Sequence, residues 1–237
     1  MESLVQKTAL ITGGTKGIGY GIAEALLNEG VNVAITGRDE KSGKAAVSSL
    51  QKSGKAKVIF IQCDVRDQQS QQDAVDKVMK EWGKLDVLVA NAGVGHFASI
   101  EELSVEKWKE TIDINLTGVF LSIKSSLEAL KRSKGYIITI SSLAGTNFFA
   151  GASAYNASKF GLTGFTQAVM LDLRKHGIKV STIMPGSVAT EFNNHTPGPE
   201  DAWKIQIEDL GQIVVDLLKM NPRTLPSKIE VRPSIPK

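Results

Sequence analysis

The stretch that decides the fold reads Thr8-Ala9-Leu10-Ile11-Thr12-Gly13-Gly14-Thr15-Lys16-Gly17-Ile18-Gly19. Its apolar start predicts a short β-strand, and the amphipathic stretch beyond it, through Ile22 and Leu27, predicts a helix. Glycines between a strand and a helix let the backbone approach a pyrophosphate, whose charge meets the free N–H groups at the helix start. A glycine-rich turn alone could be an ordinary loop, but its position after the first strand favours a dinucleotide site. The loop is not a Walker A motif, because no Gly-Lys-Ser/Thr follows at the right spacing.

The same alternation of strands and helices continues along the chain. Further strands are expected at 32–36, 58–61, 86–90, 136–140, 179–183 and 228–232, and helices at about 39–52, near 74–82, and at 107–131, 154–175 and 210–220. Strands that are apolar throughout predict a parallel sheet covered on both faces, whereas the alternating last strand suits an exposed edge. We therefore expect one α/β, Rossmann-like domain over residues 1–237, a doubly wound parallel sheet of about seven strands that binds ligands at the strands' carboxyl ends.

Composition excludes several classes of protein. The chain has 237 residues, of which 42% are hydrophobic and 22% charged, as in an ordinary globular domain. The net charge of +3 is dispersed, so no nucleic-acid partner is expected. Cys63 is the single cysteine, which excludes an internal disulfide, and no spacing predicts a metal site. The sequence begins Met1-Glu2 with no signal-like segment and has no run of the ~20 apolar residues that span a bilayer, so we expect a cytoplasmic protein.

A tyrosine and a lysine one helical turn apart carry the clearest chemical signal. Tyr155 and Lys159 lie on one face of the helix expected at 154–175. A cation close to a phenol stabilises the phenolate and moves its pKa towards working pH, where the phenol serves as a general acid or base. A surface helix with a snorkelling lysine would show the same spacing.

The end of the second strand bears on the choice of cofactor. Enzymes that use NAD commonly place an acid there to bind the ribose 2'-hydroxyl, but this chain has Arg38. A charge-assisted hydrogen bond from Arg38, with help from Lys16, would favour NADP by about 10²-fold or more. Asp39 follows directly and could bind a ribose hydroxyl instead, which leaves NAD open.

Five motifs in order resemble the short-chain dehydrogenase/reductase family over about residues 8–190. The glycine loop is similar to the family's Thr-Gly-x-x-x-Gly-x-Gly. Asn91-Ala92-Gly93 resembles its Asn-Ala-Gly, although Ala90 stands where a second Asn is usual. The other matches are Asn115, Ser142 thirteen residues before Tyr155, and Pro185-Gly186 with Thr190 after it.

The resemblance implies an NADP-dependent oxidoreductase that interconverts a ketone or aldehyde and its alcohol by hydride transfer. It implies that Ser142 hydrogen-bonds the substrate carbonyl, Tyr155 is the acid/base, Lys159 holds the ribose and lowers the Tyr155 pKa, and Asn115 holds a water. It places Asp64 at the adenine amino group, although Asp64 could instead cap a turn. The cofactor-binding residues expected are Gly13, Thr15, Lys16, Gly17, Ile18, Gly19, Arg38, Asp64, Val65, Asn91, Ala92, Gly93, Tyr155, Lys159, Pro185, Gly186, Val188 and Thr190.

Substrate choice in this family comes from loops beyond the strand ends. These are 94–97, 143–149 and a substrate loop at about 187–206, all rich in apolar and aromatic residues that suit a carbonyl compound with an apolar group. His96, Phe148, Phe149 and Trp203 could line substrate or only cover core. The chain ends with Pro226-Ser227-Lys228-Ile229-Glu230-Val231-Arg232-Pro233 rather than the glycine-rich ending of acyl-carrier reductases. Reduction of 3-oxoacyl thioesters and a non-catalytic NADP-binding sensor remain alternatives, and the resemblance implies a homodimer or homotetramer.

Overall fold

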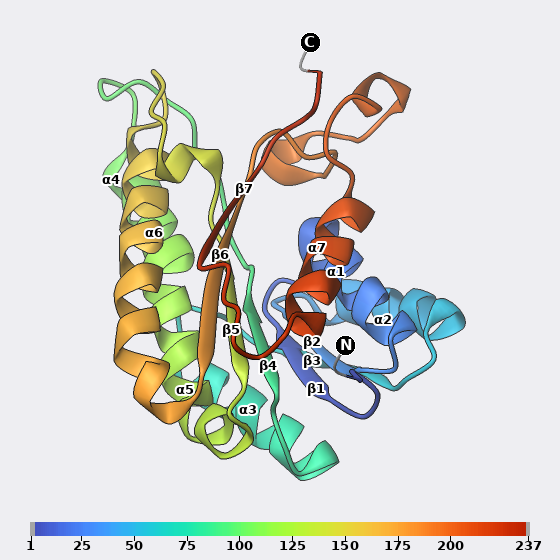
Figure 1. Cartoon of the computed structure of the whole chain (residues 1–237). Coiled ribbons are helices and arrows are strands. Elements are labelled where there is room, and N and C mark those ends of the chain that lie inside the picture. Colours follow the sequence, from blue (N-terminus) through green and yellow to red (C-terminus); the bar gives the residue numbers. More distant parts are fainter. Residues whose placement is uncertain (1–2, 236–237) are drawn as a thin grey trace.

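Seven parallel strands form one sheet in the computed structural model, which describes residues 3–235. The expectation drawn from Met1 and Glu2 lies outside the described residues. The sheet order is β3-β2-β1-β4-β5-β6-β7, and every pairing is parallel (Figure 1). The strands are β1 (Thr8–Ile11), β2 (Asn32–Gly37), β3 (Val58–Gln62), β4 (Val87–Ala90), β5 (Tyr136–Ile140), β6 (Lys179–Pro185) and β7 (Lys228–Val231).

Helices cover both faces of this sheet, as expected for a doubly wound fold. On one face lie α1 (Gly17–Asn28), α2 (Glu40–Ser53) and α7 (Ile207–Lys219); on the other lie α3 (Gln68–Trp82), α4 (Val105–Ile112), α5 (Gly118–Ser133) and α6 (Ser153–Leu173) (Figure 1). The central strand β1 contributes to both cores, since Ala9 and Ile11 face α1 and α7 while Leu10 faces α3 and α5. Such two-sided burial explains why the inner strands are continuous apolar runs.

The strand order puts the switch point between β1 and β4. Residues 9–11 of β1 pair with residues 33–35 of β2 on one side and with residues 87–89 of β4 on the other. The chain runs outward from β1 to β3, then returns to β4 and runs outward the other way, so the loops after β1 and β4 diverge to opposite faces. A crevice forms at that point in open α/β sheets. The glycine loop and Asn91-Ala92-Gly93 therefore meet at the same edge.

The long helix expected at 107–131 has a local widening in its middle. It runs from Val105 to Ser133, but residues Asp113–Thr117 are π-helical, and the Gly118 N–H donates to the Asp113 carbonyl five residues back. A π segment is one extra residue in an α-helix and often marks a functional site. Apolar periodicity alone does not reveal it, and it turns Asn115 inward, where this residue is fully buried.

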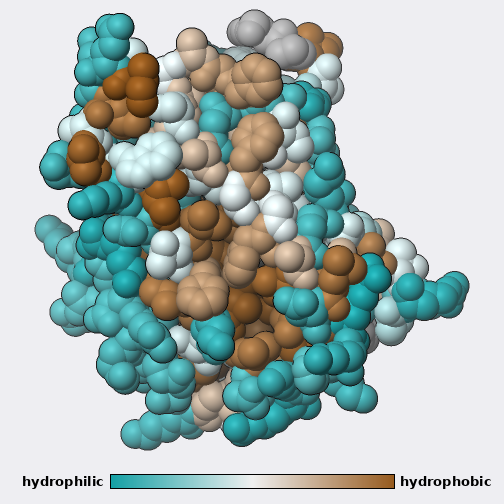
Figure 2. Space-filling view, turned by 90° about the vertical axis from the view of Figure 1, so that its left-hand side faces the viewer, coloured by the Kyte–Doolittle hydropathy of each residue, from teal (hydrophilic) through white to brown (hydrophobic). Residues whose placement is uncertain are grey.

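The hydrophobic residues of the helices bear on two kinds of contact, with a membrane and with another protein. Among residues 3–235 no helix combines the length and apolar character needed to cross a membrane. The outer face of α4, α5 and α6 nevertheless carries hydrophobic side chains, which Figure 2 shows gathered in the middle of that face. Its exposed members include Trp108, Phe120, Phe160 and Leu171.

Candidate active site

The glycine loop presents the start of α1 to the cleft. Gly13 has φ 66°, and a Cβ at this position would lie 2.9 Å from Ala92 Cα, so only glycine fits the turn. Lys16 occupies the N-cap position without a side-chain cap, and the first turn of α1 contains no acid. The first N–H groups of a helix and its positive dipole end attract anions. This end of α1 is therefore built to receive a phosphate.

Asn91 ties the end of β4 to the glycine loop. Its side-chain amide donates to the carbonyl oxygens of Thr12 and Gly13 at 2.9 and 3.0 Å, while the Thr12 hydroxyl accepts from the main-chain N–H groups of Asn91 and Ala92. Gly19 lies directly beneath, and a Cβ there would come within 2.5 Å of the Asn91 amide nitrogen. Gly19 thus allows close packing under the loop, and it is the one expected cofactor residue that does not line the cleft.

A continuous cleft of ≈ 1520 Å³ runs across the carboxyl ends of the strands. Its volume exceeds that of ordinary small-molecule pockets, as a dinucleotide plus substrate would require. At one end lie the turn after β2 and the residues after β3; at the other lie α6 and the segment after β6. The expected cofactor residues that line it are Gly13, Thr15, Lys16, Gly17, Ile18, Arg38, Asp64, Val65, Asn91, Ala92, Gly93, Tyr155, Lys159, Pro185, Gly186, Val188 and Thr190. These residues fit a nicotinamide dinucleotide.

Three of the four expected catalytic side chains meet at one end of this cleft. Ser142 follows β5; its hydroxyl accepts from the Ala144 N–H at 3.1 Å and donates to the Pro185 carbonyl at a long 3.4 Å. Tyr155 and Lys159 come from the first turns of α6, and the Lys159 ammonium lies 5.7 Å from the phenol ring centroid. The ammonium donates to the Ile140 carbonyl at 2.9 Å, which fixes it beneath the cleft.

Burial changes the pKa values of both Lys159 and Tyr155. It lowers the pKa of Lys159 to about 8, because the apolar surroundings disfavour the charged ammonium. It also raises the pKa of Tyr155 above its ordinary value, against the opposing effect of a hydrogen bond with Ser142. The sequence-based expectation of a phenol acidified by Lys159 is thus not met by the protein groups alone. At neutral pH the phenol keeps its proton and is ready to donate it.

Asn115 lies just behind the cleft rather than in its wall. Its side-chain oxygen accepts from the Val94 N–H at 2.8 Å, and its amide donates to the Val94 carbonyl at 2.9 Å and to Ser158 Oγ at 3.0 Å. Ser158 in turn donates to the Tyr155 carbonyl. Asn115 therefore links the loop after β4 to the helix that carries Tyr155. Sequence reasoning missed Ser158, whose only signal is its place between Tyr155 and Lys159.

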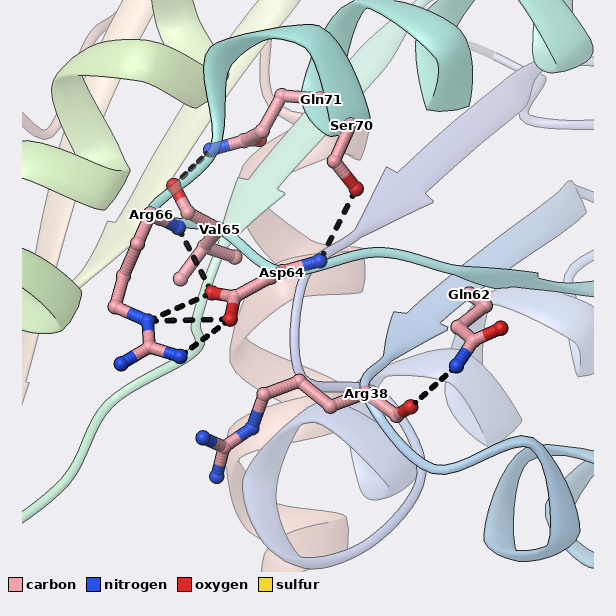
Figure 3. A network of polar contacts seen from close by, with 7 residues as sticks. All are labelled: Arg38, Gln62, Asp64, Val65, Arg66, Ser70 and Gln71. Atoms are coloured by element: carbon pink, nitrogen blue, oxygen red, sulfur yellow. Dashed lines mark hydrogen bonds and ion pairs between the residues drawn. The ribbon is translucent and has the colours of Figure 1, made fainter.

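Arg38, Asp39 and Asp64 line the other end of the cleft, and Arg66 lies next to Asp64 (Figure 3). Asp64 caps a turn by accepting from the Arg66 N–H at 3.0 Å, so the turn reading left open from the sequence is confirmed. The Arg66 side chain also binds the carboxylate and holds the pKa of Asp64 below its ordinary value. Asp39 caps α2 through the Ser42 N–H at 2.8 Å. In the described part of the chain no carboxylate forms an ion pair with the Arg38 guanidinium, which lines the cleft.

Two aromatic rings from separate loops pack against the Tyr155 phenol. The Tyr155 ring centroid lies 5.3 Å from that of Phe97 and 5.8 Å from that of Phe192, and Phe149 packs against Phe97 at 6.1 Å. These rings and Trp203 line the cleft, whereas Phe148 points out and is 85% exposed. His96 pairs with Glu110 at 2.9 Å instead of entering the cleft. The loop from Ser187 to Gln206 is tied at its base, where Val188 and Ile205 form a β-bridge.

Comparisons with known proteins identify the family of the chain. Residues 7–200 match the short chain dehydrogenase family. The chain is 38% identical to trans-4-hydroxycyclohexanecarboxylate dehydrogenase of Sinomonas cyclohexanicum (88% of this chain, 85% of the relative) and 35% identical to a 3-oxoacyl acyl-carrier-protein reductase of Chlamydia muridarum (85% and 80%). Its fold matches an alcohol dehydrogenase of the archaeon Thermococcus sibiricus solved with 5-hydroxy-NADP, with TM-score 0.91, 28% identity and 98% of both chains covered.

The chain belongs to the short chain dehydrogenase family. It is an oxidoreductase that uses a nicotinamide cofactor to interconvert a carbonyl compound and its alcohol by hydride transfer.

Proposed function

We propose that the chain is an NADP-dependent reductase of apolar ketones or aldehydes, in which Tyr155 is the acid/base. The observation that carries this proposal is the meeting of Tyr155, Ser142 and Lys159 at one end of a cleft that has Arg38 at its other end. The bound nicotinamide would supply a hydride to the carbonyl carbon. Side chains of this chain would bind the substrate oxygen and supply its proton.

Each side chain has a role that its present contacts support. Ser142 exchanges its long bond to the Pro185 carbonyl for the substrate oxygen, and Tyr155 gives that oxygen its proton. Lys159, held on the Ile140 carbonyl, keeps two further ammonium protons for ribose hydroxyls and for the charge that forms on the phenolate. Asn115 holds the Val94 loop against α6, and its proposed role is to hold a water through which the proton is replaced.

NADP is proposed in preference to NAD because of the contacts that Arg38 and Asp39, the two residues after β2, make. The Arg38 guanidinium has no carboxylate partner in an ion pair among residues 3–235, whereas one oxygen of Asp39 is committed to the cap of α2. The Arg38 guanidinium can therefore bind a phosphate with two parallel hydrogen bonds. The Asp39 carboxylate does not prevent this, because it is already bonded to the start of α2. The alcohol dehydrogenase of Thermococcus sibiricus, solved with 5-hydroxy-NADP, supports the same choice.

A panel of carbonyl compounds tests the proposed reaction. NADPH consumption is measured with apolar ketones, aldehydes, diketones and 3-oxoacyl thioesters, and we expect turnover of the apolar ketones and aldehydes. Thioesters as the fastest substrates would favour the alternative that the Chlamydia muridarum relative suggests. Binding of NADPH without turnover of any carbonyl compound would contradict an enzyme and favour a redox sensor.

The aromatic rings around the phenol predict which substrates bind. Phe192→Ala removes one wall of this pocket, and an aromatic wall that covers apolar substrate is worth ~1.5–3 kcal/mol. We expect kcat/KM for a cyclohexyl ketone to fall about 10- to 10²-fold, with the Kd of NADPH unchanged. Phe148→Ala is the matched control, since Phe148 is exposed and outside the cleft. Equal losses in both variants would show that Phe192 does not contact the substrate.

We also propose that the enzyme is a homo-oligomer. The exposed hydrophobic side chains of α4, α5 and α6, gathered on the face in Figure 2, support a homodimer or homotetramer that buries this face. A patch of this kind is typical of an interface between copies.

The single buried cysteine, Cys63, is compatible with the reducing cytoplasm, which we propose as the location.

A further inference from the structure

Arg66 lies next to the cleft residues Asp64 and Val65 and binds the Asp64 carboxylate, but it has no part in the reaction proposed above. Its Nη2 lies 2.5 Å from Asp64 Oδ2, and its Nε lies 3.0 Å from Oδ1 and 3.1 Å from Oδ2 (Figure 3). Its main-chain N–H adds a fourth bond to the same carboxylate. A guanidinium that binds both oxygens of a carboxylate fixes its orientation as well as its charge. Asp64 is therefore held in place.

The turn that carries this pair is anchored on both sides. The Asp64 N–H donates to Ser70 Oγ at 3.2 Å, in the first turn of α3. The buried amide of Gln71 donates to the Val65 carbonyl at 2.7 Å and to the Gly118 carbonyl at 2.9 Å, at the start of α5. The positions of Asp64 and Arg66 are consequently set by the core and not by the solvent-exposed loop alone.

Arg38 lies at the end of the neighbouring strand. Gly37 pairs with Gln62 in the sheet, and the Gln62 side chain donates to the Arg38 carbonyl at 2.8 Å, so Arg38 and Asp64 follow adjacent strand ends. Figure 3 shows the Arg66 guanidinium bonded to the Asp64 carboxylate and the Arg38 side chain without a bond to it. Arg38 contributes to the field on Asp64, but the carboxylate pairs with Arg66 and not with Arg38.

We propose that Arg66 is a positioning residue for NADP recognition: by holding the Asp64 carboxylate, it leaves the Arg38 guanidinium available for the 2'-phosphate. The charge of Arg38 also acts on Asp64. Without Arg66, the Arg38 guanidinium would therefore turn to the carboxylate, and the unpaired negative charge of Asp64 would also repel the phosphate. This inference rests on the proposed preference for NADP. It separates two functions that lie side by side: Arg38 binds the phosphate, and Arg66 keeps a neighbouring acid from competing for Arg38.

The test uses two probes that differ only in the 2'-phosphate, adenosine 2',5'-bisphosphate and 5'-AMP, with the Kd measured by calorimetry. Contacts to adenine cancel in the ratio of the two Kd values. Arg66→Ala is expected to weaken binding of the bisphosphate about tenfold and that of 5'-AMP less than about twofold. Arg66→Lys keeps the charge but not the fork, and we expect a smaller loss. Arg132→Ala, at the end of α5 away from the cleft, is the matched control and should change neither Kd.

A double-mutant cycle identifies the mechanism. If Arg66 acts through Asp64, then in the Asp64→Asn background the Arg66→Ala change should alter the ratio of Kd values by less than about twofold. A full tenfold loss in that background would overturn the proposal, because Arg66 would then contact the phosphate itself. An unchanged ratio in the single variant would overturn it as well. A wild-type protein that binds both probes equally would instead refute the preference for NADP, whatever Arg66 does.

Discussion

Tyr155→Phe is expected to lower kcat by ~10²-fold or more while the Kd of NADPH stays within about twofold. The change removes only the transferable proton, whose delivery by a positioned acid contributes ~10²–10⁴-fold to a rate. The ring contacts with Phe97 and Phe192 remain, so the pocket keeps its shape. Turnover of an apolar ketone and fluorescence titration with NADPH measure the two quantities.

Tyr20→Phe provides the matched control. The Tyr20 hydroxyl bonds to Ser49 Oγ at 3.0 Å between α1 and α2, outside the cleft. Its loss removes one exposed hydrogen bond, worth about 1 kcal/mol or less of stability, and should leave kcat unchanged. If Tyr155→Phe retained wild-type turnover, another group would have to be the acid, and the proposed mechanism would be wrong.

Arg38→Asp is expected to change the preference for NADPH over NADH by about 10²-fold or more. The variant loses a charge-assisted hydrogen bond worth ~1.5–3 kcal/mol and places a carboxylate where the 2'-phosphate would lie. The same carboxylate can accept from the 2'-hydroxyl of NADH, so affinity for NADH should improve. The kcat/KM values of both cofactors with one ketone give the preference.

Arg132→Asp introduces the same change of charge at the far end of α5 and controls for a general electrostatic effect. Charges separated by more than ~8–10 Å are largely screened at physiological salt, so this control should leave the preference unchanged. An Arg38→Asp enzyme that still selects NADPH would mean that the phosphate binds elsewhere. Such a result would also remove the basis for the role of Arg66.

Most of the fold could be predicted because its signals are local. Apolar runs bounded by turn residues locate strands to within one or two positions, as with β1 and β5, and continuous burial predicts parallel pairing. The alternating pattern of residues 228–232 correctly predicts the edge strand β7, whose exposed and half-buried residues alternate. The π segment at Asp113–Thr117 could not be predicted, since one extra residue in a long helix does not disturb its apolar pattern visibly.

At the site, sequence spacing indicated which residues gather but not what each one contacts. The spacing that joins Tyr155 to Lys159 says nothing about the rings of Phe97 and Phe192, which come from distant loops and pack against the phenol. It also does not reveal the burial that raises the pKa of Tyr155. Asp64 was expected to face adenine or to cap a turn. Its pairing with Arg66 two residues later depends on the turn geometry, for which an acid followed by an arginine is only a weak signal.

The central claim is that Tyr155 passes its proton to a carbonyl oxygen beside the nicotinamide of a cofactor whose pyrophosphate lies at the start of α1. A crystal structure with NADP⁺ and the alcohol product tests it most directly. The account predicts the alcohol oxygen within about 2.6–3.2 Å of the Tyr155 hydroxyl, with the 2'-phosphate on Arg38. An alcohol oxygen out of hydrogen-bond reach of Tyr155, or a nicotinamide outside the cleft, would contradict it.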